Sequence, residues 1–162
     1  GERPHMSDWT DHLSTAFPEV RLKKFLEMRG ADGGPWKRIC ALPALWVGLL
    51  CDQTALDAAW DLVKGWTQEE RDKLLADVPT LALKAPFRGR PLLDVAREVL
   101  KISEAGLKAR GRDNSIGSDE TAFLDTLQAI AESGITPAEE MLARFNGPWQ
   151  GKIDPVYDEY AF

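Results

Sequence analysis

The sequence predicts a mainly α-helical fold with one β-strand near its N-terminus. Through most of residues 35–162, apolar residues recur at three- and four-residue spacing, and residues that begin or end helices separate the runs. Residues 21–29 instead alternate with a period of two, which is typical of a strand. Six tryptophans and an apolar share of 44% give a chain of 162 residues enough material for a packed core.

Two segments precede the helical part. Residues 1–18 are a lead-in that holds a helix of about two turns. Residues 21–29 form the strand, in which Glu27 and Arg29 share one face because side chains two apart in a strand point the same way. A single strand leaves backbone donors and acceptors unpaired, so it needs a partner sheet that this sequence does not contain.

The helical body, residues 35–162, follows a glycine-rich turn. Its first helix is apolar on nearly every side, which predicts a helix buried all round with a kink or a break at Pro43. Thr67 and Glu70 have the spacing of a capping box, and Thr136 precedes a proline at a first helical position. The expected helices cover about residues 36–52, 54–65, 67–77, 92–110, 120–133 and 137–145.

Composition excludes several classes of protein. A net charge of −6 gives no basic surface for nucleic acid or an anionic membrane. No apolar run reaches the roughly 20 residues that span a bilayer, and no signal-peptide pattern opens the chain, so we expect a cytoplasmic protein. Cys40 and Cys51 are roughly 16 Å apart along one expected helix, too far to form a disulfide with each other. Without a Cys-x-x-Cys or His/Cys cluster, a structural zinc site is not expected.

Glu27 and Arg29 are the residues most suited to chemistry. A carboxylate can hold a metal ion, and a guanidinium can bind phosphate oxygens through two parallel hydrogen bonds. Side by side on one face, the two groups suit a nucleotide-dependent reaction. The same spacing also allows an ordinary surface ion pair, and spacing alone does not distinguish the two.

Several longer motifs resemble one enzyme family, the glutamate–cysteine ligases of plants and alphaproteobacteria. The similarity runs from about residue 8 to the last residue, but it covers only the C-terminal part of those longer enzymes. Residues 1–162 are therefore expected to be a single C-terminal fragment of a larger catalytic domain. The motifs are LEMRGADGGPW at 26–36, CALPALWVGLL at 40–50, LKAPFR at 83–88, TPAE at 136–139, NGPW at 146–149 and DPVY at 154–157.

The resemblance implies a fold and a reaction. The fold is a glutamine-synthetase-like α+β ligase, whose active-site sheet would include the strand at 21–29. The enzymes use ATP and Mg²⁺ to phosphorylate the γ-carboxylate of glutamate, and the amine of cysteine then displaces phosphate to give γ-glutamylcysteine, the first step of glutathione synthesis. By resemblance, Glu27 is a metal ligand and Arg29 is a catalytic residue that also binds ATP. The fragment alone is expected to be inactive, because most of the site lies elsewhere.

Two further residues have weaker claims to the substrate site. Asp32 would contact substrate, or would be a turn aspartate that accepts backbone N–H bonds. Trp36 would form a wall of the substrate pocket, or would be a core tryptophan at the start of a buried helix. Cys40 lies in a motif shared with plant relatives that are controlled by disulfide switching, although a buried free cysteine is the simpler interpretation.

Two other functions stay open from the sequence. The chain could be a non-catalytic helical interaction module that associates with itself through its uncovered strand. It could also belong to a related carboxylate–amine ligase that uses glutamate and a different amine, because nothing in this segment identifies the amine pocket.

Overall fold

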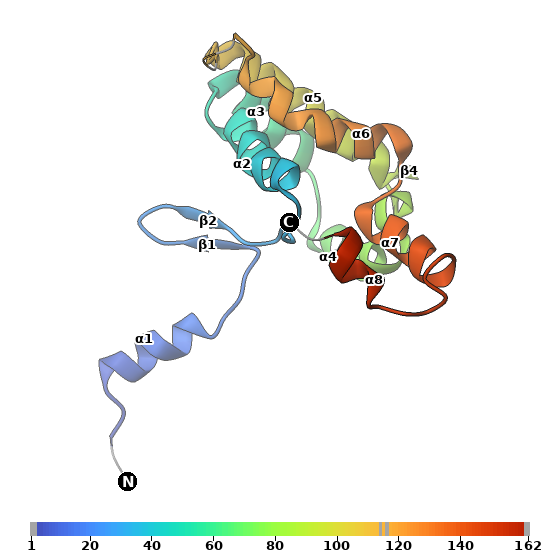
Figure 1. Ribbon diagram of the computed structural model, residues 1–162. Helices are drawn as coiled ribbons and strands as arrows, with labels where there is room; N and C mark the ends of the chain where they lie inside the picture. The colour runs from blue at the N-terminus through green and yellow to red at the C-terminus, as the bar shows by residue number, and fades with distance from the viewer. Residues whose placement is uncertain (1–2, 114, 116, 161–162) are drawn as a thin grey trace. The chain divides into compact units, whose positions relative to one another are not determined.

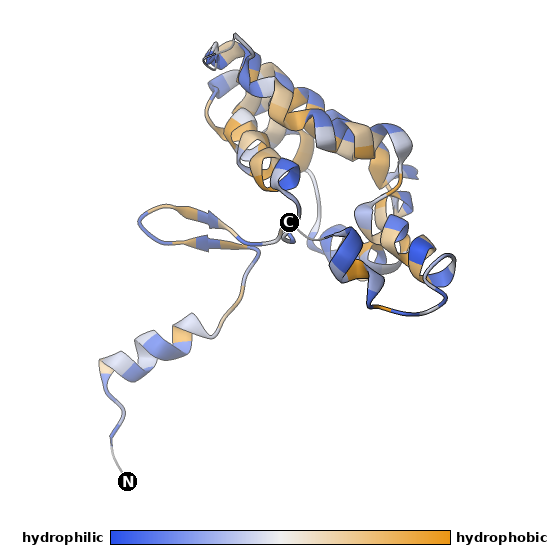
Figure 2. Cartoon of the chain, viewed as in Figure 1, coloured by the Kyte–Doolittle hydropathy of each residue, from blue (hydrophilic) through white to orange (hydrophobic). Residues whose placement is uncertain are grey.

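The computed structural model of the chain describes residues 3–113, 115 and 117–160, which fall into two compact units that divide between Gly33 and Gly34. The first unit holds α1 (Met6–Ser14) and a hairpin of β1 (Val20–Leu22) and β2 (Leu26–Met28) (Figure 1). Helix α1 is the short helix expected in the lead-in; it is mostly hydrophilic (Figure 2) and buries no side chain. The second unit is largely helical, so the prediction of a mainly α chain is confirmed.

The single strand predicted over residues 21–29 is wrong, because this segment folds back on itself. Strands β1 and β2 are antiparallel, with Arg21 opposite Glu27. The turn between them is closed by a bond from the Lys23 N–H to the Phe25 carbonyl (2.9 Å). Pairing continues past the strand ends, where the Arg29 N–H donates to the Glu19 carbonyl (2.8 Å). The chain therefore supplies a partner for each strand itself, which satisfies one edge of each.

The hairpin keeps the two faces that the alternation predicts. Directly opposite residues of an antiparallel pair share a face, so Val20 with Met28 and Leu22 with Leu26 form one apolar face. Leu22 is 80% exposed and Leu26 is 56% exposed. A two-stranded hairpin with an uncovered apolar face is marginally stable by itself in water. We call this surface the apolar face of the hairpin.

The second unit follows most of the predicted elements. Helices α3, α5 and α7 lie close to their expected ranges, while α4 continues past residue 77 and through Pro79. The β3–β4 hairpin and α8 were not predicted. The elements are α2 (Trp36–Leu50), α3 (Gln53–Val63), α4 (Gln68–Leu81), the 3-10 helix η1 (Ala82–Lys84), β3 (Pro86–Phe87), β4 (Arg90–Pro91), α5 (Leu92–Arg110), the 3-10 helix η2 (Glu120–Leu124), α6 (Asp125–Ser133), α7 (Pro137–Asn146) and α8 (Pro155–Glu159).

No helix in the described part of the chain is by itself long and apolar enough to cross a bilayer. Helices α2 and α3 meet the criteria of length and composition only when taken together, as a pair bent by 92°.

Helix α2 corrects one prediction and narrows another. It is not buried all round, and it runs through Pro43, which excludes the break but not the kink that was expected there. The elements that contact it are α3, α5, η2 and α6. On its exposed side, Trp36 is 75% exposed and Ile39 is 50% exposed. The apolar content of the helix therefore exceeds what the second unit covers. The buried residues are Ala41, Ala44, Gly48 and Leu49.

Helices α2 and α5 pack closely against each other. A Cβ atom at Gly106 would lie 1.9 Å from the Gly48 carbonyl oxygen, and one at Gly48 would lie 2.3 Å from the Ser103 carbonyl oxygen. Ser103 is fully buried and its hydroxyl donates to the Leu45 carbonyl (3.0 Å). Because glycine has no side chain, the two backbones approach to a distance that no other residue allows. This contact fixes α2 against α5.

An ion pair holds the start of α7 to η1. The Lys84 ammonium lies 2.5 Å from Glu139 Oε1, and the Thr136 N–H donates to Glu139 Oε2 (2.9 Å). These bonds lower the pKa of Glu139 from 4.5 to about 2, and the bond with Lys84 has the largest effect. A carboxyl whose pKa is lower in the folded chain stabilises the fold above its unfolded pKa, and this contribution is lost as the pH falls.

A Glu139→Gln variant tests that linkage. Glutamine can keep the capping box with Thr136 but loses the charge, so the variant should melt below wild type at neutral pH. The difference should shrink as the pH falls below 4.5 and be mostly lost near pH 2, where wild-type Glu139 is itself about half protonated. Thermal melts across this range are the measurement. Glu132→Gln is the control, because Glu132 is exposed on α6 and has no ion pair within the described residues; a constant difference would contradict the linkage.

Candidate functional site

The second face of the β1–β2 hairpin carries charge. Arg21 and Glu27 are directly opposite, with Arg21 Nε 3.9 Å from Glu27 Oε2, and Lys23 Nζ lies 4.0 Å from the same oxygen. Arg29 follows Glu27 by two residues in the same extended run, so it projects from the same side. We call this surface, made of Arg21, Lys23, Glu27 and Arg29, the charged face of the hairpin.

Two polar atoms of the charged face are buried without a hydrogen-bond partner among the described residues. They are Glu27 Oε2 and Arg29 Nη1. Leaving a buried donor or acceptor unpaired costs about 1–3 kcal/mol, and more for a charged group. A ligand that offers oxygen acceptors to the guanidinium and a cation to the carboxylate would satisfy both atoms. This arrangement suits the binding of an oxyanion together with a metal ion.

The chain itself can offer only part of a metal site. Within the described ranges, no three His, Cys, Asp or Glu side chains are placed to share an ion. Glu27 has cationic neighbours in Arg21 and Lys23. A Mg²⁺ ion bound to nucleotide commonly takes one or two protein carboxylates and completes its octahedron with phosphate oxygens and water. Glu27 fits the role of one such ligand, with any others drawn from outside this chain.

Asp32 makes no contact with the charged face among the described residues, and Trp36 belongs to the other unit. Asp32 follows the hairpin as an exposed residue of the first unit and makes no hydrogen bond in the described structure, so a turn aspartate is not what the fold shows. Trp36 begins α2 in the second unit and is 75% exposed, so the interpretation as a core tryptophan is wrong. Their contacts with substrate remain predictions.

Two residues of this region escaped the sequence analysis as site residues. Arg21 joins the site through the hairpin register, and Phe17 joins it through its ring, which lies under the guanidinium carbon of Arg29 at 5.1 Å and that of Arg21 at 6.0 Å. The interruption of the alternation at Lys24 was the one hint of a turn in this segment. The observed turn is centred on Lys24, and this register places Arg21 opposite Glu27.

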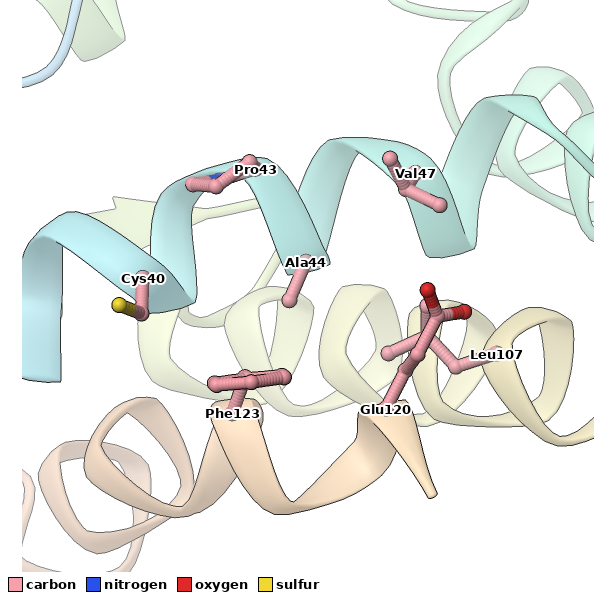
Figure 3. Close-up of a pocket in the computed structure, with 7 residues that line it drawn as sticks. All are labelled: Cys40, Pro43, Ala44, Val47, Leu107, Glu120 and Phe123. Atoms are coloured by element: carbon pink, nitrogen blue, oxygen red, sulfur yellow. The ribbon is translucent and has the colours of Figure 1, made fainter. Parts of the chain in front are cut away.

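A separate apolar cavity lies in the second unit between α2, α5 and η2 (Figure 3). Its volume is about 260 Å³. The Phe123 ring faces α2, with Cys40 and Ala44 on the opposite wall, and Glu120 at the edge is paired with Arg110 (2.9 Å). Cys40 and Cys51 are both free thiols, as their spacing predicted, and Cys40 is half-buried. The cavity offers almost no polar groups that could orient a charged substrate.

Comparison with known proteins gives one consistent result. A family model described as glutamate-cysteine ligase family 2 (GCS2) matches residues 1–159. Curated chloroplastic glutamate–cysteine ligases match the whole chain: that of Solanum lycopersicum is 48% identical and that of Arabidopsis thaliana is 49% identical, with 30% of each relative covered. Glutamate–cysteine ligase A of Oryza sativa subsp. indica is 49% identical, with 32% covered.

Two consequences concern length and location. The chain spans about 30% of the length of the Solanum lycopersicum and Arabidopsis thaliana relatives. The expectation of a cytoplasmic protein is contradicted by this comparison, because these relatives are chloroplastic enzymes. Composition could not test the expectation, since proteins of the cytoplasm and of the plastid interior need not differ in charge or hydropathy.

Proposed function

The chain belongs to glutamate–cysteine ligase family 2, and on that premise we propose that it forms part of an ATP-dependent ligase that joins glutamate to cysteine, with Glu27 and Arg29 in its reaction site. The observation that carries the proposal is the pair of buried polar atoms on the charged face of the hairpin, Glu27 Oε2 and Arg29 Nη1, that have no hydrogen-bond partner among the described residues. The hairpin would add to an antiparallel sheet formed by the rest of the ligase, as in a glutamine-synthetase-like fold. Its free edges and apolar face would then be covered.

The residues of this chain would act by position and charge. Arg29 presents planar N–H donors that match two phosphoryl oxygens and would stabilise negative charge as the phosphoryl group moves to glutamate. Glu27 would hold one coordination position of a Mg²⁺ ion, which when bound screens the charge of the nucleotide phosphates. Arg21 and Lys23, each about 4 Å from the Glu27 carboxylate, would keep it oriented on the charged face.

The proposal predicts that activity needs the chain and the rest of a ligase together. The purified 162-residue chain should release no phosphate in the presence of ATP, glutamate and cysteine. A chimera in which the chain replaces the matching 30% of the Arabidopsis thaliana relative should form γ-glutamylcysteine. Product formation by mass spectrometry and phosphate release are the measurements. Ligase activity of the chain alone, or a folded but inactive chimera, would contradict the proposal.

A second candidate function rests on the apolar face of the hairpin. With Leu22 80% exposed and both hairpin edges free, the chain could be a module that pairs with a second copy of itself. Size-exclusion chromatography at several concentrations, with and without Mg·ATP, distinguishes the two functions. A dimer that forms regardless of nucleotide and is broken by Leu22→Lys favours the module.

A further inference from the structure

Phe17 stands out among the exposed aromatic residues because of the charges around it. It is 76% exposed, so its ring is not held by a core. The guanidinium carbon of Arg29 lies over the ring, 5.1 Å from its centre, and that of Arg21 lies 6.0 Å from the same centre. Two arginines of the charged face, one from each side of the hairpin, thus share one aromatic ring.

A ring in this position determines which part of each guanidinium is available. The face of a guanidinium stacks on an aromatic ring, while its N–H groups point outward in the plane and stay free to bind oxygens. Arg21 is further fixed by a bond from Nη2 to the Ala16 carbonyl (3.0 Å), next to Phe17 in the chain. Arg29 has no such bond, and its Nη1 is a buried atom without a partner in the described structure. Among the described residues, the Phe17 ring is therefore the contact that orients the Arg29 guanidinium.

We propose that Phe17 is a positioning residue, which holds the Arg29 guanidinium flat, with Arg21 beside it, so that both arginines bind the oxygens of one phosphoryl chain. Glu27 lies next to Arg21, and its negative charge offsets part of the positive charge of the two arginines. The ligand class is a polyphosphate or an acyl phosphate, which share the same oxygens. This inference rests on the proposed function, because it assigns the phosphoryl group to the charged face.

The hairpin offers a matched control. Phe25 lies in the β1–β2 turn, is 62% exposed, and has no cation over its ring among the described residues. Phe17→Leu and Phe25→Leu are therefore the same substitution within the first unit, and only the first removes the contact with the arginines. Phe17→Trp keeps an aromatic face and serves as the rescue variant.

The test is an NMR titration of the chain, with ¹⁵N-labelled arginine, using inorganic tripolyphosphate in one arm and acetyl phosphate in the other. Without ligand, the Nε–H signals of Arg29 and Arg21 should carry ring-current shifts that disappear in Phe17→Leu and persist in Phe17→Trp and Phe25→Leu. Tripolyphosphate should move both signals, and Phe17→Leu should raise its dissociation constant about 2- to 5-fold, which corresponds to one exposed cation–π contact. The arm that binds more tightly identifies the phosphoryl ligand.

The outcomes separate this inference from the proposed function. If Arg29→Ala weakens binding but Phe17→Leu behaves like Phe25→Leu, the positioning role is wrong and the phosphate site stands. Two results would show that the phosphate site and the role of Phe17 are both wrong. One is an Arg29 signal that millimolar tripolyphosphate and acetyl phosphate leave unchanged, and the other is an Arg29→Ala variant that binds these ligands like wild type.

Discussion

A Gly106→Ala variant is expected to lose much of the stability of the second unit. The added methyl group would lie 1.9 Å from the Gly48 carbonyl oxygen and 2.9 Å from the Ala55 Cβ, and neither atom can move without shifting a helix. Forcing extra atoms into a packed core typically costs about 1–3 kcal/mol, and a clash with backbone belongs at the upper end or beyond. Urea unfolding followed by circular dichroism measures the loss.

The chain contains a control for this substitution. Gly65 has only an ordinary contact at 3.8 Å to the Arg88 guanidinium, so Gly65→Ala should unfold near the wild-type midpoint. Gly48→Ala should resemble Gly106→Ala, since its methyl group would lie 2.3 Å from the Ser103 carbonyl oxygen. A Gly106→Ala chain as stable as Gly65→Ala would mean that α2 and α5 are further apart than the structure places them.

In the active chimera, Arg29→Ala is expected to lower kcat by about 10²- to 10³-fold, the usual effect of removing one donor that stabilises transition-state charge. Arg29→Lys should recover only part of this loss, because an ammonium cannot form two parallel bonds to phosphoryl oxygens. Steady-state kinetics with ATP, glutamate and cysteine is the measurement.

Lys24→Ala is the control for the kinetic prediction. Lys24 is an exposed cation in the turn of the same hairpin, and it is not part of the charged face, so its loss should leave kcat near wild type. If Lys24→Ala and Arg29→Ala lower kcat equally, the hairpin contributes only general positive charge. If neither substitution lowers kcat, Arg29 has no part in the reaction.

Helices with a clear capping residue at one end were predictable from the sequence. Helix α5 was expected over 92–110 and has these bounds, because an apolar stripe runs along it and Gly111, at φ +55°, ends it in a left-handed conformation. Helix α7 begins where Thr136 caps it through a box with Glu139. Proline was a poor guide, since α2 contains Pro43 and α4 contains Pro79.

The hairpin shows why the strand prediction failed. Its turn, Lys23–Phe25, contains no glycine, asparagine or proline, so no residue marks the reversal of the chain. Alternation also continues on both sides of the turn, which makes a hairpin look like one long strand. The shared face of Glu27 and Arg29 depends only on a spacing of two, so it was predictable. The approach of Arg21 and Phe17 depends on pairing across the turn, which the alternation does not encode.

The central claim is that Glu27 and Arg29 act together on nucleotide phosphate, and a crystal structure of the chimera with Mn²⁺ and ADP tests it most directly. We expect an anomalous Mn²⁺ peak within coordination distance of the Glu27 carboxylate, close to the roughly 2.0–2.1 Å of a Mg²⁺ ligand. We also expect a phosphate oxygen about 2.7–2.9 Å from the Arg29 guanidinium. Metal and phosphates bound elsewhere, with Glu27 still facing only Arg21 and Lys23, would contradict the account.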